Sequence, residues 1–227
     1  MGEVMRKILI VAVHPDDESL GCGGTLLHHK AQGDSIHWLI LTEPTAEYGF
    51  DASYDAHKQK VIQQVADAYD FDSVQQLGFP ATGLSDLKEC DLVQSLSTVI
   101  NELQPEVVYV PFHSDVHGDH KVAFQALMSA TKSFRHPSIK RILMIETISE
   151  TDQAISNPSS SFTPNVYVDI TSHVEEKLKI LALYDTEIKD APFPRSIDAV
   201  RALSCYRGAA IEVMHAESFM LLREKIV

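Results

Sequence analysis

The chain has 227 residues, of which 44% are hydrophobic and 22% charged, and its formal net charge is −13. A chain of this length can bury a core without disulfides or metal staples, and its negative charge repels a phosphate backbone, which argues against general nucleic-acid binding. No apolar run approaches the ~20 residues that a membrane helix needs, so we expect no membrane span.

Strand-like and helix-like segments alternate along the chain. The first apolar stretch is rich in β-branched residues, as is typical of a strand buried on both faces. In chain order we expect a strand at 7–13, a helix at 19–32, a strand at 35–42, a helix at 51–70, a strand at 74–77, a helix at 91–103, a strand at 106–112, a helix at 119–134, strands at 141–148 and 165–170, helices at 175–185 and 197–205, and a strand at 216–223. Proline and serine predict a loop at 149–164.

This alternation predicts an α/β fold. We expect a three-layer, Rossmann-like domain in which a mostly parallel sheet is flanked by helices. The segment 149–164 is followed by another strand and is therefore not a domain linker, so residues 1–227 are interpreted as a single domain.

The N-terminus and the cysteines bear on the cellular compartment. The first apolar stretch follows two basic residues, but it is too short for a signal peptide and charged residues follow it at once. Cys22, Cys90 and Cys205 form no CxxC pair, which argues against a disulfide framework. We expect buried, reduced thiols in a cytoplasmic protein.

Two clusters of metal-ligating residues follow predicted strands. Residues 14–18 (HPDDE) come directly after the first strand, and residues 117–120 (HGDH) follow the strand at 106–112. In open α/β sheets, ligands bind at the carboxyl ends of the strands, where the strand order reverses. If these two strands are neighbours, the clusters face each other across one crevice.

The residue types fit a catalytic zinc site, which has three protein ligands and one open position. His14 and Asp17 are three residues apart, so a tight turn can direct both to one point. A histidine of the second cluster, His117 or His120, supplies the third ligand, and the spacing does not decide which. Asp16 then lies beside the metal, where a free carboxylate can take a proton from water that the metal activates.

The second cluster has a further role in this interpretation. As an imidazolium, His117 could stabilise a tetrahedral oxyanion and protonate a leaving amine. Asp119 could orient it and favour its charged form. Taken singly, each cluster also fits a strand-end turn or a helix cap with surface histidines. Their joint position at strand ends favours a site.

The glycines of residues 21–24 (GCGG) allow a second interpretation. A glycine-rich turn after the first strand is where dinucleotide folds hold pyrophosphate. GCGG does not fit GxGxxG, however, and it lies inside the predicted helix. We therefore expect these glycines to let the helix pack closely, not to bind a nucleotide.

Together these motifs resemble those of a known family. AVHPDDESLGCGGTL and HGDH look like the paired signatures of LmbE-like, or PIG-L-type, N-deacetylases. Further segments resemble the branch often found near bacterial cell-surface sugar genes, so the resemblance covers essentially the whole chain: LGFPATGL, VPFHSDVHGDHKVAF, IKRILMIETISET, FPRSIDAVRALSCYRG and HAESFMLLRE.

The resemblance implies a zinc-dependent hydrolase that removes the acetyl group from an N-acetylglucosamine-type amino sugar or its conjugate, and it suggests a homo-oligomer. Another divalent metal could serve, because two histidines and one aspartate discriminate weakly among such ions. Carried over by position, the implied residues are His14, Asp17 and His120 as metal ligands, Asp16 as general base, His117 as oxyanion stabiliser or acid, and Asp119 as the partner of His117.

One departure concerns substrate contacts. Family members commonly place an arginine in the loop after the second strand, but residues 43–60 contain none. The nearest cationic candidates are His57 and Lys58. Arg195 and Arg207 lie in family-like segments and could contact a sugar hydroxyl or phosphate, or equally form structural ion pairs.

Two residues beside the second motif, His113 and Asp115, are expected to line the pocket. Two rival functions remain at this point. The chain could hydrolyse another N-acyl group or an ester, or it could be a non-catalytic sugar-binding module on the same fold. The presence of Asp16 disfavours the latter, because a degenerate site should tolerate loss of its base.

Overall fold

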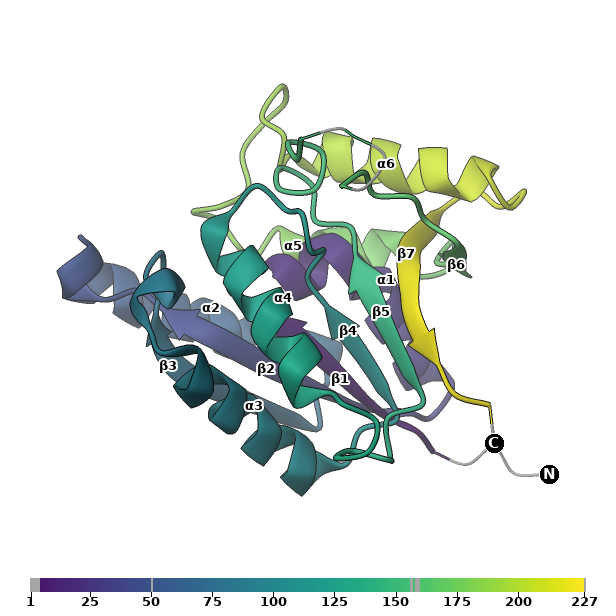
Figure 1. Cartoon of the computed structure of the whole chain (residues 1–227). Coiled ribbons are helices and arrows are strands. Elements are labelled where there is room, and N and C mark those ends of the chain that lie inside the picture. Colours follow the sequence, from purple (N-terminus) through teal and green to yellow (C-terminus); the bar gives the residue numbers. More distant parts are fainter. Residues whose placement is uncertain (1–4, 50, 156, 158–159, 227) are drawn as a thin grey trace.

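The computed structural model describes residues 5–49, 51–155, 157 and 160–226. Its centre is a seven-stranded sheet with the order β3-β2-β1-β4-β5-β7-β6 (Figure 1). The strands are β1 (Lys7–Ala12), β2 (Ser35–Glu43), β3 (Ser73–Pro80), β4 (Val107–Val110), β5 (Arg141–Ile145), β6 (Val166–Asp169) and β7 (Ala216–Glu224). The first five strands pair in parallel, and β7 pairs antiparallel with both β5 and β6. The mostly parallel sheet is confirmed.

Helices cover both faces of this sheet, which gives the expected three layers (Figure 1). The helices are α1 (Asp17–Ala31), α2 (Ala52–Tyr69), α3 (Glu89–Leu103), α4 (Gly118–Ala130), α5 (Val174–Leu181) and α6 (Ile197–Ala209), with short 3₁₀ helices η1 (Ala46–Tyr48) and η2 (Leu84–Asp86). Side chains of α1, α2, α5 and α6 share one apolar core, and those of α3 and α4 share the other.

The strand β1 shows why its sequence is apolar throughout. Successive side chains of a strand point to opposite faces. Ile8 and Ile10 lie in the core beneath α1 and α5, whereas Leu9 and Val11 lie in the core beneath α3 and α4. All four are buried, so neither face of the strand tolerates a polar residue.

Five helices differ from expectation by two or more residues at an end; α3 begins at Glu89, not at residue 91, and α5 ends at Leu181, not at residue 185. The helix α1 begins at Asp17, not at residue 19, because acidic side chains in a first turn complement the helix dipole. The helix α4 ends at Ala130, short of residue 134; the amide and hydroxyl of Thr131 both donate to Leu127 O, which closes the last turn. The helix α6 continues to Ala209, past residue 205.

The structure also bears on the cysteines and on membrane-spanning helices. All three cysteines are free, but only Cys22 is buried; the expectation was wrong for Cys90 and Cys205, which are exposed on helix surfaces. In the described part of the chain, no helix combines the length and apolarity required to cross a bilayer.

The glycines of α1 allow the close packing that the sequence suggested. A Cβ atom added to Gly24 would lie 2.8 Å from the side chain of Ile170, and one added to Gly23 would lie 2.2 Å from the hydroxyl of Tyr69. The helix is also kinked at Cys22, where φ is −148°. This close packing fixes α1, and with it the turn at residues 14–16 that precedes it, tightly against the sheet.

We expect Gly24→Ala to destabilise the fold by about 1–3 kcal/mol, because overpacking a filled core forces side chains or backbone to shift. Urea unfolding measures the free energy. Gly118→Ala is the matched control: a Cβ added there meets nothing within 4 Å, so its stability should stay within about 0.5 kcal/mol of the parent. Equal stability of the two variants would contradict close packing at Gly24.

Candidate active site

The two histidine clusters lie at neighbouring strand ends. The strands β1 and β4 pair directly, in the register Ile8 with Val107 and Ile10 with Tyr109. The chain leaves β1 toward β2 and returns at β4 on the other side, so the strand order reverses here. The ring centroid of His14 lies 4.6 Å from that of His117 and 5.4 Å from that of His120. The expectation that both clusters face one crevice is confirmed.

Three side chains converge in a geometry that suits a metal ion. Ligand atoms of His14, Asp17 and His120 lie within 4.8 Å of one another. The Oδ2 atom of Asp17 accepts hydrogen bonds from the amides of Val13 and His14, each at 2.9 Å. Burial alone would raise the pKa of Asp17, but the neighbouring imidazoles of His120 and His14 hold it well below its ordinary value. Asp17 is therefore anionic at neutral pH.

The two nitrogens of His120 have different surroundings. Its Nδ1 lies 2.8 Å from Oδ2 of Asp115. Its Nε2 is buried, has no hydrogen-bond partner among the described residues, and lies 3.4 Å from Oδ2 of Asp17. A carboxylate on one ring nitrogen and a free second nitrogen is the arrangement that metal-binding histidines adopt. The donor set therefore fits a divalent ion.

A second group, His14, His117 and Asp119, also meets the distance condition for a metal site. It overlaps the first at His14 but is less buried, and its members are largely hydrogen-bonded. The Oδ2 atom of Asp119 contacts Nε2 of His14 at 3.2 Å and accepts from the amide of Thr82 at 2.7 Å. The buried, unpartnered Nε2 of His120 favours the first group.

The role expected for Asp119 is corrected by these contacts. Its carboxylate faces His14, not His117, and also accepts from the amide of Leu84 at 3.2 Å. The link to His117 runs the other way: the amide of Asp119 donates to Nδ1 of His117 at 3.1 Å, which makes His117 the N-cap of α4. The pKa of His117 is lowered to about 4, by burial and then by His14. The charge of Asp119 opposes this lowering of the His117 pKa but does not outweigh it.

The backbone of Asp16 is strained. Its φ is 149° and its ψ is −24°, a region that costs a non-glycine residue about 1–3 kcal/mol and occurs mainly at functional sites. The side chain is buried, and its Oδ2 accepts from Nη1 of Arg195 at 2.9 Å. Burial and the adjacent charge of Asp17 raise the pKa of Asp16 to about 7, against the opposing effect of Arg195 and Lys58.

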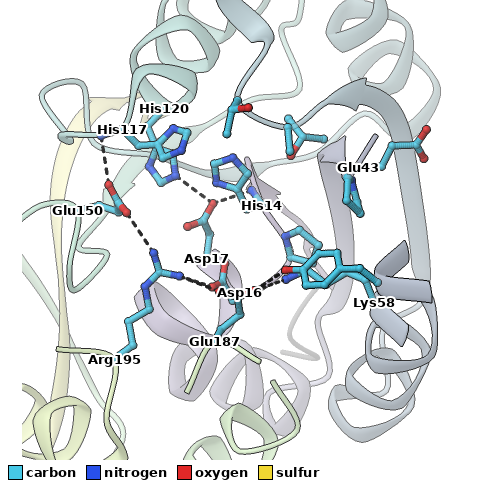
Figure 2. A pocket seen from close by; sticks show the side chains of 16 residues that line it. His14, Asp16, Asp17, Glu43, Lys58, His117, His120, Glu150, Glu187 and Arg195 are labelled. Atoms are coloured by element: carbon cyan, nitrogen blue, oxygen red, sulfur yellow. Dashed lines mark hydrogen bonds and ion pairs between the residues drawn. The ribbon is translucent and has the colours of Figure 1, made fainter. Parts of the chain in front are cut away.

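A pocket of about 220 Å³ opens over these groups (Figure 2). It is lined by His14, Pro15, Asp16, Asp17, Thr42, Glu43, Pro44, Tyr54, Lys58, Ala81, Thr82, His117, His120, Glu150, Glu187 and Arg195. Figure 2 shows Arg195 between Glu150 and Asp16, on the side of the pocket away from Glu43. The Nη2 atom of Arg195 donates to Glu150 at 3.2 Å.

The residues expected from sequence to contact substrate differ in whether they line the pocket. Arg195 and Lys58 line the pocket. Arg207 lies outside it and pairs with Glu146. His57 binds Asp185 at the surface, 2.7 Å away.

The two residues beside the second motif do not line the pocket either. Asp115 is completely buried and holds His120, while Thr151 donates to its Oδ1 at 2.7 Å. The ring of His113 packs on Phe112 and Phe124. Neither side chain lines the pocket, and the chain turns here, with the amide of Asp115 donating to the carbonyl of Phe112.

Four charged or polar residues of the pocket carried no recognisable signal: Glu43, Tyr54, Glu150 and Glu187. Each lies outside the two motifs, and an isolated acid or tyrosine has no spacing that distinguishes it from a solvated surface residue. The loop that the sequence predicted at 149–164 does supply Glu150, whose Oε2 accepts from the amide of His117 at 3.1 Å. Only the folded chain brings them to one cavity.

If a divalent ion binds at His120 Nε2, Asp115→Asn should weaken its affinity by about 10- to 100-fold, the usual effect of altering the carboxylate behind a ligand histidine. Titration calorimetry with Zn²⁺ or Co²⁺ measures this. Asp185→Asn is the matched control, because Asp185 also holds a histidine but outside the pocket. An Asp115→Asn affinity equal to that of the control would argue against a metal at His120.

The comparisons with known proteins agree with this geometry. The model of the PIG-L family, described as GlcNAc-PI de-N-acetylase, matches residues 9–131. A diacetylchitobiose deacetylase from Thermococcus kodakarensis is 22% identical, with 94% of this chain and 82% of the relative covered.

Two solved structures share the fold. A conserved protein from Thermus thermophilus has a TM-score of 0.78 and 26% identity, with 98% of this chain and 97% of that chain covered. N,N'-diacetylchitobiose deacetylase from Pyrococcus horikoshii has a TM-score of 0.76 and 21% identity, with 96% and 84% covered. Since the family model spans more than half of the chain and includes both histidine clusters, the chain belongs to the PIG-L, or LmbE-like, family of N-deacetylases.

Proposed function

We propose that the chain is a zinc-dependent N-deacetylase that removes the acetyl group from an N-acetylglucosamine-type amino sugar or a conjugate of one. The observation that carries the proposal is the buried Nε2 of His120, which has no hydrogen-bond partner among the described residues and lies 3.4 Å from Oδ2 of Asp17, with His14 and Asp16 beside them. Family membership and relatives named as deacetylases of acetylated sugars support it.

In this proposal His14, Asp17 and His120 hold the ion. A bound Zn²⁺ would act as a Lewis acid that polarises the amide carbonyl and makes water a better nucleophile near neutral pH. The pocket residues supply what remains: a base for the proton of the attacking water, a donor for the developing oxyanion, and groups that hold the sugar.

Asp16 is proposed as the general base. Its carboxylate is buried next to the ligand set, and Arg195 holds its Oδ2 at 2.9 Å. The strained backbone at Asp16 directs the side chain to this position. A base is most effective when its pKa lies near the working pH, and the pKa of Asp16, raised to about 7, meets that condition.

His117 is proposed as the oxyanion donor, in its neutral form. Because Nδ1 of His117 accepts the amide of Asp119, the ring proton lies on Nε2. A neutral N–H can stabilise a developing negative charge, and the lowered pKa of His117 keeps the ring neutral at pH 7. This replaces the imidazolium that the sequence alone suggested. Asp119 is proposed to orient His14.

We expect Asp16→Asn to lower kcat/KM for acetate release from N-acetylglucosamine derivatives by at least ~100-fold, the scale of removing a general base. Free, oligomeric and nucleotide-linked sugars form the panel, with Zn²⁺ present, and longer N-acyl groups and esters run beside them. Zn²⁺ binding without any turnover would favour a sugar-binding module, and faster release of another acyl group would favour the alternative hydrolase.

The pH profile provides a second test. The base must be ionised, so the rate should fall as pH drops through the pKa of Asp16, at or below about 7 once a cation is bound. Arg195→Met removes a charge that lowers this pKa, so the acidic limb should move to higher pH, and Arg195→Lys should move it less. Arg207→Met, outside the pocket, is the control and should leave the limb in place. An unmoved limb in Arg195→Met would contradict this role.

The proposal extends to the assembly and the compartment. We take residues 1–227 as one deacetylase domain that forms a homo-oligomer in the cytoplasm. The family resemblance supports the oligomer, and light scattering of the purified protein measures it.

A further inference from the structure

The pocket contains more carboxylates than cationic side chains. Its charged lining consists of Asp16, Asp17, Glu43, Glu150 and Glu187 on one side of the balance, and Lys58 and Arg195 on the other. A divalent ion would reduce this excess without removing it. Because a cleft lined by one sign of charge focuses its field, an anionic substituent entering the pocket meets repulsion.

Both cations are already engaged by carboxylates. Arg195 donates to Asp16 at 2.9 Å and to Glu150 at 3.2 Å, and its Nη1 lies 3.5 Å from Glu187. The Nζ atom of Lys58 donates to Glu187 at 2.7 Å, and Lys58 is buried. The charge of each cation is therefore already compensated, and a phosphate that approached either would also meet the carboxylates paired with it.

Unlike Asp16, Glu150 and Glu187, Glu43 has no lysine or arginine partner among the described residues. It lies at the end of β2, across the pocket from Arg195 (Figure 2). Within the described residues, its side chain forms neither a hydrogen bond nor an ion pair, although it is half-buried. An ionised carboxylate accepts hydrogen bonds and donates none. Glu43 is thus available to a sugar hydroxyl or an ammonium group.

The size of the cavity points the same way. Its volume of about 220 Å³ is below the ~300–1,000 Å³ typical of sites for drug-sized ligands. It suits a single sugar ring beside the metal-binding group. The rest of a larger substrate then lies at the opening of an acidic pocket.

We propose that this pocket selects amino sugars that carry no phosphate or carboxylate: a neutral N-acetylhexosamine, or one joined to a sugar with a free amine, with Glu43 as the acceptor that favours the latter. This selectivity rests on the proposed deacetylation. It excludes sugars linked to nucleotides or phospholipids from the efficient substrates of this chain.

The test compares the methyl glycoside of N-acetylglucosamine with N-acetylglucosamine 1-phosphate, which differ only in the substituent at C1. For the protein with Zn²⁺ at low salt, kcat/KM for acetate release should favour the methyl glycoside by at least ~10-fold, and the ratio should shrink as added salt screens the repulsion. Chitobiose that bears one acetyl group and one free amine should be turned over at least as well as the methyl glycoside.

Glu43→Gln should lower the preference for the methyl glycoside by about threefold or more, as expected for one charge removed near the substrate. Glu47→Gln is the matched control in the same segment: Glu47 is exposed and outside the pocket, so the ratio should not change. Equal rates for the two sugars, or a ratio that is insensitive to salt and to Glu43→Gln, would overturn the proposed selectivity.

Binding separates this inference from the proposed function. Calorimetry on Asp16→Asn with Zn²⁺ measures the affinity for the same two sugars without turnover. Tighter binding of the methyl glycoside supports the selectivity even if the parent protein releases no acetate, a result that would count against deacetylation alone. Equal or tighter binding of the phosphate sugar overturns the selectivity whatever the rates.

Discussion

The parallel pairing of β1 with β4 is the constraint on which the site depends. Both strands are buried on both faces, so their register is fixed by the two apolar cores that they separate. Their carboxyl ends lie side by side where the strand order reverses, and the loops that leave them have to diverge. His14 comes from the loop after β1 and His120 from the first turn of α4, which follows the loop after β4; the two are more than a hundred residues apart in the chain and meet because the strands do.

Around that pairing, the polar groups satisfy one another in layers. Asp17 binds the amides of Val13 and His14, and Asp115 binds His120 while Thr151 binds Asp115. These contacts restrict the rotation of Asp17, His120 and Asp115. The buried Nε2 of His120 has no hydrogen-bond partner among the described residues, and it lies where the side chains of His14 and Asp17 converge. Because this hydrogen bonding already holds the side chains in place, the cation site that we propose is preorganised.

Carboxylates outnumber lysine and arginine side chains in the lining of the pocket. Arg195 is shared among three carboxylates, and Lys58 is committed to Glu187. Buried charges are tolerated only when they are paired, so these two cations stabilise the cluster of carboxylates. One of these, Asp16, has its pKa raised to about 7. The glycines of α1 let the helix pack closely on Ile145 and Ile170. This packing holds the start of the helix, and the strained Asp16 before it, in place.

The sequence by itself determined the fold class, the place of the site at two strand ends, and the residues of both motifs, because periodicity and spacing are local properties. Tertiary structure alone decided what each residue contacts. The carboxylate of Asp119 contacts His14, that of Asp115 contacts His120, and Arg207 pairs with Glu146 outside the pocket. The local sequence does not predict these contacts, because most of the partners are distant in the chain. Glu43, Glu150 and Glu187 reach the pocket from three separate segments. An isolated carboxylate has no pattern, so only the packing of the whole sheet and its loops brings such groups into one field.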